Sequence, residues 1–293
     1  MKYLSDDETI NEVSIPGTHD SLTRYVNERP WYEYGLSTGN LNNGWAQTQG
    51  YSLQQQLDRG VRSFDLRFDK NGYGLHGSME VDDGQFVLAH CTNEDGSYIT
   101  YLNAMKILAK FVTDHSSEFV MVVIMATWEG ETYTGIAADD AQVDQQYHGV
   151  IVNNISKPVV SNIRGHIVKS VSGFEDFVPE VVMPVSLTTM FGAYKMWRAV
   201  DFLLVNDDIK KGILAGYKYY DNINFTGWNI SNLRNNPMKA AQFLNNLVIG
   251  KLKPYAMDTS EKIGWWEFDT SYGDLEPNHN IAAAIYLVND LTH

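Results

Sequence analysis

The chain has 293 residues, of which 44% are hydrophobic and 20% are charged, a composition that allows a large buried core. Its 22 lysines and arginines are outnumbered by 36 aspartates and glutamates, so the net charge is −14 at pH 7. This acidity argues against a nucleic-acid-binding protein, which needs a basic surface for the phosphate backbone, and against purely electrostatic adhesion to anionic membranes.

Cysteine content and hydropathy further limit the classes of protein to which the chain can belong. Cys91 is the only cysteine, which excludes an intramolecular disulfide and a cysteine-based zinc site. The first residues lack the apolar stretch of a signal peptide, and the longest apolar run, 119–128, is too short to span a bilayer. No Pro/Gly/Ser-rich linker divides the chain, so we expect a single domain over 1–293.

In chain order, predicted strands alternate with helical patterns. Short β-branched runs predict eight strands, at 13–15, 61–67, 86–90, 119–127, 166–171, 202–205, 222–226 and 263–268. Apolar residues at helical spacing predict helices near 53–57, 101–114, 238–248 and 281–291. This order favours an α/β fold, a single (β/α)8 TIM barrel. The helix signal is weak over 172–200, so we expect a distorted barrel with irregular crossovers.

The segment 14–21, Ser-Ile-Pro-Gly-Thr-His-Asp-Ser, is the first candidate for chemistry. A predicted strand ends in Pro-Gly and is followed at once by His19 and Asp20. Catalytic groups of a barrel project from the carboxyl ends of its strands. We therefore interpret the pair as catalytic and not as an isolated structural histidine.

The segment 60–67, Gly-Val-Arg-Ser-Phe-Asp-Leu-Arg, is the second candidate. Asp65 and Arg67 are two residues apart on a predicted strand, so their side chains share one face. An inward arginine near a barrel mouth indicates an anion site, for which phosphate is the expected ligand. A structural ion pair with Asp65 explains the same spacing, and both interpretations remain open.

Together these two segments resemble the motifs of bacterial phosphatidylinositol-specific phospholipase C. The resemblance continues in order along the chain, at 45–49, 86–90, 117–118, 164–168, 223–226 and 264–269. It implies a barrel enzyme that cleaves phosphatidylinositol by attack of the inositol 2-hydroxyl on phosphorus, which releases diacylglycerol and leaves a cyclic inositol phosphate.

The resemblance also implies roles for individual residues. His19 corresponds to the general base, and Asp269 to the aspartate that orients it. Asp20 corresponds to the partner of the acid histidine, and Arg67 to the cation on the non-bridging phosphate oxygens.

Two histidines are candidates for the general acid. His90 follows the apolar residues 86–88, the strand expected to carry the acid, although Cys91 stands where the family usually has glycine. His76 is followed by Gly77 and lies closer to Arg67 in the chain. We favour His90 and keep His76 as the alternative.

The resemblance implies no metal and no other cofactor. Calcium-dependent relatives build their metal site from acidic residues where this chain has Arg67. Calcium also needs several oxygen ligands, and no loop of that kind is visible in the sequence.

Head-group recognition departs from the family pattern. The family has a lysine and an arginine near the positions of Met125 and Ser172, so both cations are missing here. Lys169 and Asp207 are the remaining candidate substrate-binding residues. Elsewhere in the chain, the two adjacent acidic residues Asp139–Asp140 are interpreted as a solvated turn.

Trp45 and Trp228 correspond to family positions that enter the lipid interface, a zone that suits aromatic rings. The expected partners are therefore the phosphatidylinositol lipid with its inositol head group, and a membrane surface contacted peripherally and transiently. The resemblance further implies a secreted monomer that binds no nucleic acid.

Two other classes are weighed against this reading. A metal-dependent glycerophosphodiester phosphodiesterase or phospholipase D-like enzyme needs an acidic metal site, against which Arg67 argues. A non-catalytic lipid- or sugar-binding barrel has no use for an acid–base set such as His19, Asp20 and Asp269.

Overall fold

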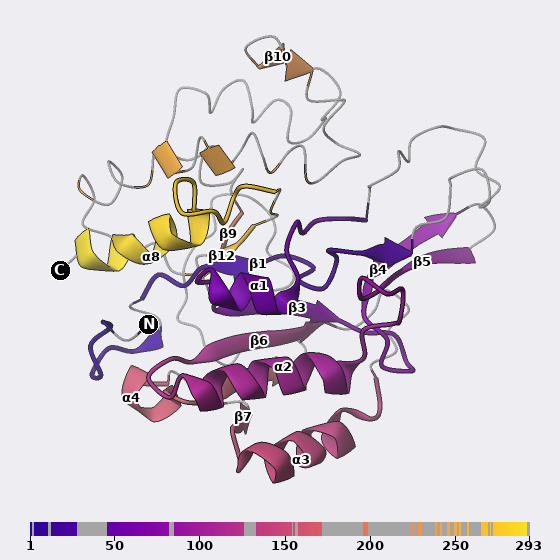
Figure 1. Ribbon diagram of the computed structural model, residues 1–293, viewed down its shortest axis with the longest axis horizontal. Coiled ribbons are helices and arrows are strands. Elements are labelled where there is room, and N and C mark those ends of the chain that lie inside the picture. The colour runs from indigo at the N-terminus through magenta and orange to yellow at the C-terminus, as the bar shows by residue number, and fades with distance from the viewer. Residues whose placement is uncertain are drawn as a thin grey trace.

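The computed structural model (Figure 1) describes the residues whose positions it defines. These are residues 1, 3–10, 13–27, 46–81, 85–125, 133–153, 155, 158–171, 196–198, 224–225, 228–229, 265–268, 270 and 272–291, with separate positions between 238 and 257.

A parallel sheet forms the centre of the described structure (Figure 1). Its order is β1-β3-β6-β8-β7, and all neighbouring strands run parallel. The strands are β1 (Gly17–Thr18), β3 (Ser63–Arg67), β6 (Val120–Met125), β8 (Ile167–Val171) and β7 (Ile151–Asn153).

The parallel arrangement continues beyond β1 to the last strand of the chain. Phe268, directly after β12 (Trp265–Glu267), forms a parallel bridge with Thr18, and β12 pairs in parallel with β9 (Met196–Arg198). The first and last strands are therefore neighbours, as in a barrel. This agrees with the predicted α/β barrel, although the strands in the described part of the chain do not close the circle.

An antiparallel hairpin interrupts the expected alternation between β3 and β6. It consists of β4 (Leu75–Val81) and β5 (Gln85–Cys91), and β2 (Val26–Asn27) pairs with the free edge of β5. The strand predicted at 86–90 exists, but it belongs to this hairpin, because β3 pairs directly with β6.

The other predicted strands have mixed outcomes. The strand expected at 222–226 contains β10 (Asn224–Phe225), which pairs antiparallel with β11 (Trp228–Asn229). Of the first strand, expected at 13–15, Ile15 forms a single bridge, and the paired strand β1 follows at Gly17–Thr18. Residues 202–205 lie outside the described structure. The short strands β7 and β9 were not predicted.

Two of the helices begin at side chains that cap them. In α1 (Leu53–Asp58), Ser52 and Gln55 form a capping box, and Thr100 caps α2 (Tyr101–Asp114). Two further helices are α4 (Val160–Ile163) and α8 (Ile281–Leu291). The predictions at 53–57, 101–114 and 281–291 are confirmed, whereas 238–248 is described only at separate helical positions.

Two described helices were not predicted. The helix α4 has only four residues, and α3 (Ile136–Tyr147) buries only Asp140 and Val143, so it shows no apolar stripe at helical spacing. The interpretation of Asp139–Asp140 as a solvated turn is therefore wrong. Both residues lie on α3, and Asp140 faces the protein interior.

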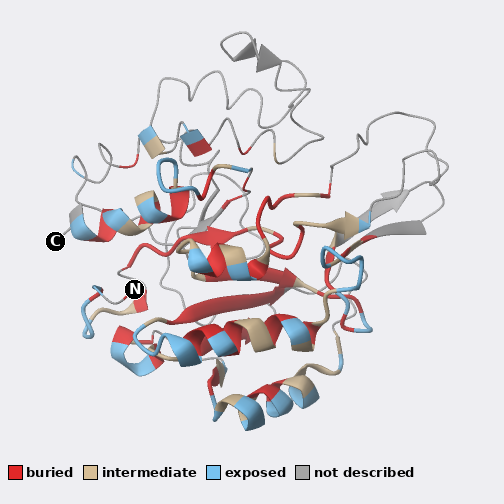
Figure 2. Ribbon diagram, viewed as in Figure 1, coloured by how far each residue is buried: buried red, intermediate tan, exposed pale blue. Residues whose placement is uncertain are grey.

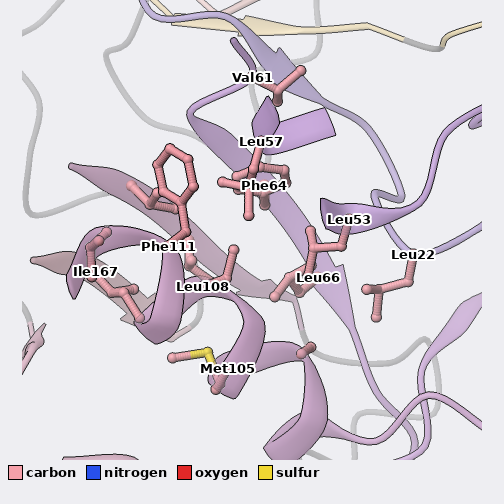
Figure 3. Packing of buried hydrophobic residues seen from close by; sticks show 14 of the residues in the cluster. Leu22, Leu53, Leu57, Val61, Phe64, Leu66, Met105, Leu108, Phe111 and Ile167 are labelled. Carbon is pink, nitrogen blue, oxygen red and sulfur yellow. The ribbon is translucent and has the colours of Figure 1, made fainter. Parts of the chain in front are cut away.

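Hydrophobic residues cover both faces of the sheet. The larger cluster joins the sheet to the helices through residues such as Phe64, Leu66 and Leu108 (Figure 3). A smaller cluster holds the residues of opposite parity on β6 and β8, Met121, Val123 and Val168, together with the segment around Ile15. Figure 2 shows the buried strands behind helices whose outer faces are exposed.

Lys169 faces the helices and not the interior of the barrel. On β8 it shares parity with Ile167 of the larger cluster, and its side chain is 3% exposed. Its ammonium forms an ion pair with Asp140 of α3 and lies 3.3 Å from the hydroxyl of Tyr101 on α2, which donates to Asp140. Desolvation by burial, followed by the negative charge of Asp140, raises the pKa of Tyr101. This placement argues against the head-group role expected for Lys169.

Removing Lys169 should therefore weaken the fold. We expect Lys169→Met to lower the free energy of unfolding by about 3–5 kcal/mol, because it leaves the Asp140 carboxylate buried without its cation. Urea denaturation followed by circular dichroism measures the change. The control is Lys110→Met, which breaks the exposed Lys110–Asp114 pair and should leave the urea midpoint unchanged. Equal midpoints for both variants would contradict this account.

Candidate active site

The turn that follows β1 carries the first two candidate residues. Asp20 has a φ of 45°, a left-handed conformation that costs a non-glycine residue about 1–3 kcal/mol. The Ser21 amide donates to the Asp65 carbonyl at 2.9 Å, which ties this turn to the adjacent strand β3. Such strain persists only where surrounding contacts hold it, and it often marks a functional site.

The Asp20 carboxylate lies at the centre of a charged cluster. One oxygen lies 2.7 Å from Nε of Arg67, and the other lies 3.1 Å from Nε2 of His76 and 3.4 Å from Nε2 of His19. The Asp20 side chain is fully buried, whereas the side chains of Arg67 and both histidines are 16–19% exposed. The cluster therefore buries its carboxylate and leaves the guanidinium and both imidazoles partly exposed.

Arg67 also contacts the second carboxylate of the cluster. Its Nη2 lies 2.6 Å from Oδ2 of Asp65, and Nε lies 3.1 Å from the same oxygen. The ion pair considered for Arg67 and Asp65 is thus confirmed. The anion site remains a prediction, compatible with a partly exposed guanidinium held between two buried carboxylates.

The two candidate acid histidines lie on opposite faces of the hairpin. Leu75 pairs with His90, and His76 pairs with Ala89, so His76 and His90 cannot share a face. His90 instead lies 3.1 Å from Oδ2 of Asp69. The structure brings His76, and not His90, to Asp20. We therefore now prefer His76 as the candidate acid. The strand predicted at 86–90 did not define which face of the hairpin carries each histidine.

His90 is part of a separate surface group. Its ring centroid lies 5.3 Å from that of Tyr98 and 6.4 Å from that of Tyr73. The Asp69 carboxylate also accepts hydrogen bonds from the backbone amides of Asn71 and Tyr73. The His90–Asp69 contact thus links strand β5 to the loop that follows β3.

Cys91 provides an independent check of the face. It has the parity of Ala89, which pairs with His76 on β4. Burial raises the pKa of the Cys91 thiol well above its usual value, and the negative charge of Asp20 adds to this, while Arg67 opposes it. Cys91 is therefore close enough to the Asp20 cluster for its charges to act on the thiol.

One group of described residues has the geometry for a metal ion: His19, Asp20 and Asp65, whose ligand atoms lie within 4.8 Å of one another. The guanidinium of Arg67, however, already contacts both carboxylates at 2.6–2.7 Å. A divalent cation here would have to displace the Arg67 guanidinium or be repelled by its positive charge, so the residues present do not fit a metal well.

Four further candidate residues lie wholly or partly outside the described structure. Asp269, Asp207 and Trp45 lie outside the described residues, and for Trp228 only the backbone of β11 is described. The neighbours of Asp269 are informative, because the His19 amide donates to the carbonyl of Phe268 at 3.2 Å. The backbone that leads into Asp269 therefore lies beside His19, as its expected role requires.

Comparison with known proteins supports the resemblance seen in the sequence. The chain is 38% identical over 79 residues to a 1-phosphatidylinositol phosphodiesterase of Listeria monocytogenes. This match covers 27% of the chain and 22% of the length of that relative. No family model matches the chain.

Solved structures show the same fold over nearly the whole chain. The phosphatidylinositol-specific phospholipase C of Listeria monocytogenes has a TM-score of 0.57 at 17% identity, over 99% of this chain and 97% of that one. A mutant of the Staphylococcus aureus phosphatidylinositol-specific phospholipase C has a TM-score of 0.57 at 15% identity, over 98% and 96%. The fold is therefore that of these TIM-barrel proteins. Among the described residues, no helix combines the length and apolar character needed to cross a bilayer.

The environment of Cys91 predicts its reactivity. We expect the thiol to resist iodoacetamide at pH 8 in the folded protein, because only the thiolate reacts and burial disfavours it. Mass spectrometry should show alkylation only after denaturation in urea, and the single cysteine makes the signal unambiguous. Rapid labelling of the native protein would show that the thiol is accessible.

Proposed function

We propose that this chain is a phosphatidylinositol-specific phospholipase C that uses the inositol 2-hydroxyl as its nucleophile. The observation that carries the proposal is the Asp20 carboxylate in contact with His19, His76 and Arg67 at the carboxyl ends of the first strands. The names of the Listeria and Staphylococcus proteins supply the substrate class.

The proposed reaction needs a base, an acid and a phosphate ligand. His19 accepts the proton of the 2-hydroxyl, whose oxygen then bonds to phosphorus. The bond from phosphorus to the glycerol oxygen breaks, and His76 donates the proton that makes diacylglycerol a neutral leaving group. Arg67 donates hydrogen bonds to the non-bridging oxygens, where negative charge increases in the transition state.

The turnover leaves His19 protonated and His76 neutral. Water can then attack the cyclic phosphate with the roles reversed, which restores both histidines and opens the ring. In this scheme Asp20 orients His76 and Arg67 together, while Asp269 keeps the expected role of orienting His19.

The proposal extends to the lipid surface. Asp207 remains the candidate ligand for the inositol hydroxyls, and Trp45 and Trp228 remain candidates for insertion into the interface. Membrane binding of the Staphylococcus aureus protein is the subject of one of the similar structures. We propose a peripheral, transient contact of a secreted, monomeric and metal-independent enzyme with membranes that contain phosphatidylinositol.

Product analysis in chelator tests this function. With pure phosphatidylinositol in mixed micelles and excess EDTA, we expect diacylglycerol and cyclic inositol phosphate at the same rate as without EDTA, because Arg67 supplies the positive charge. Phosphorus NMR identifies the cyclic product. Activity that disappears in EDTA and returns with Ca²⁺ would favour a metal at His19, Asp20 and Asp65, and hence a metal-dependent phosphodiesterase.

The choice of acid histidine can be tested with leaving groups. On phosphatidylinositol, His76→Ala should lower turnover by roughly 10²–10⁴-fold, the usual range for a positioned acid. On an inositol phosphate ester of nitrophenol the same variant should recover most activity, because nitrophenolate leaves without a proton, whereas His19→Ala should not recover.

The matched control is His90→Ala on the same hairpin. Because His90 lies on the other face with Asp69, its removal should change turnover on either substrate less than threefold. If His90→Ala shows the leaving-group recovery and His76→Ala does not, the acid is His90.

A further inference from the structure

Buried side chains of a neighbouring segment hold the backbone of His19. Nε2 of Gln49 donates to the His19 carbonyl at 2.6 Å and lies 3.2 Å from the Phe268 carbonyl. Its Oε1 accepts from the hydroxyl of Thr270 at 2.7 Å. Gln49 is completely buried, so one amide ties together the turn that carries His19, the Phe268 carbonyl and the Thr270 hydroxyl, which come from the residues before and after Asp269.

Two threonines complete this support. The hydroxyl of Thr48 lies 3.0 Å from the His19 carbonyl, and the hydroxyl of Thr23 donates to the Asp20 carbonyl at 2.8 Å. The two hydroxyl oxygens are 2.6 Å apart. Side chains thus reach the carbonyls of both His19 and Asp20.

This support is needed because Asp20 is held at a φ of 45°. If the turn relaxed to an ordinary conformation, the Asp20 carboxylate would move away from Arg67 and His76, and the His19 imidazole would move with its backbone. A shift of about 1 Å at a reacting group can cost about 10²-fold in rate. A buried amide with three polar contacts can prevent that shift, since breaking them would strand polar groups away from water.

We propose that Gln49 is a positioning residue for His19, assisted by Thr48. It does not touch the substrate. It fixes the His19 carbonyl against Phe268, the residue that follows β12, and so sets the distance between the imidazole and the attacking hydroxyl. This inference rests on the proposed function of His19 as the base.

The chain offers a matched control for a merely structural role. Asn289 is also a buried amide that bonds backbone on the same segment, since it accepts from the Ser14 amide at 2.6 Å and donates to the Ser14 carbonyl at 3.0 Å. It joins α8 to the residues before β1 and lies outside the turn that carries His19 and Asp20. Its loss should weaken the fold without moving the base.

The experiment compares Gln49→Met with Asn289→Leu, both close in size to the residue replaced. On a short-chain, monomeric phosphatidylinositol we expect Gln49→Met to lower kcat by about 10–100-fold with KM changed less than about threefold. Asn289→Leu should lower the melting temperature by a similar amount and keep kcat within about threefold of the parent. A loss of kcat that follows melting temperature equally in both variants would overturn the inference.

Thr48 supplies a milder pair in case Gln49→Met does not fold. Thr48→Val removes the hydroxyl at nearly constant shape, and Thr48→Ser retains it. We expect Thr48→Val to lower kcat by about threefold to tenfold, and Thr48→Ser to retain at least half of the parent activity. Equal activity of the two variants would count against positioning through the His19 carbonyl.

A second measurement separates this inference from the proposed function. The ring signals of His19, assigned by comparison with His19→Gln, can be followed by NMR in each variant whether or not the protein is active. A protein that releases no cyclic inositol phosphate would contradict the proposed function. The positioning inference is then supported if Gln49→Met shifts or broadens the His19 signals and Asn289→Leu does not, and it fails if both leave them unchanged.

Discussion

A buried carboxylate governs the arrangement of this site. The Asp20 side chain is excluded from water, and an isolated buried charge would be very costly, so it must be compensated by partners held nearby. Arg67 and His76 provide this from two separate parts of the chain. The strained turn at Asp20, the hairpin that carries His76 and the inward face of β3 all serve that one requirement.

The parallel pairing of β1 with β3 brings the two sequence motifs, 14–21 and 60–67, together. Thr18 pairs with Phe64, so the residues that follow each strand emerge at the same end of the sheet. Asp65 and Arg67 then face the turn at His19 and Asp20, while Phe64 and Leu66 enter the core against the helices (Figure 3). The same alternation that fills the core therefore delivers the charges to the site.

Local sequence patterns were sufficient to predict part of this site. The spacing of Asp65 and Arg67 predicted a shared face, and their contact confirms it. The faces of His76 and His90 could not be predicted, because they depend on how β4 and β5 pair, including an irregularity between His76 and Ser78. The pairing of Lys169 with Asp140 was not predicted for a similar reason. Lys169 was a candidate substrate-binding residue and Asp140 part of an expected solvated turn, and only tertiary packing makes them a buried pair.

Charge balance links the acid to its partner. Among the described groups of the cluster, Asp20 and Asp65 bring two negative charges and Arg67 returns one positive charge, which leaves one negative charge in excess. The proposed reaction starts with His76 as the proton donor, and in that form the imidazolium beside Asp20 would balance this negative charge. Under the proposed function, the contact at 3.1 Å between His76 and Asp20 would serve two needs, since the same proton would balance this charge and protonate the leaving glycerol oxygen. His90, beside Asp69 on the other face of the hairpin, would leave that excess charge in place.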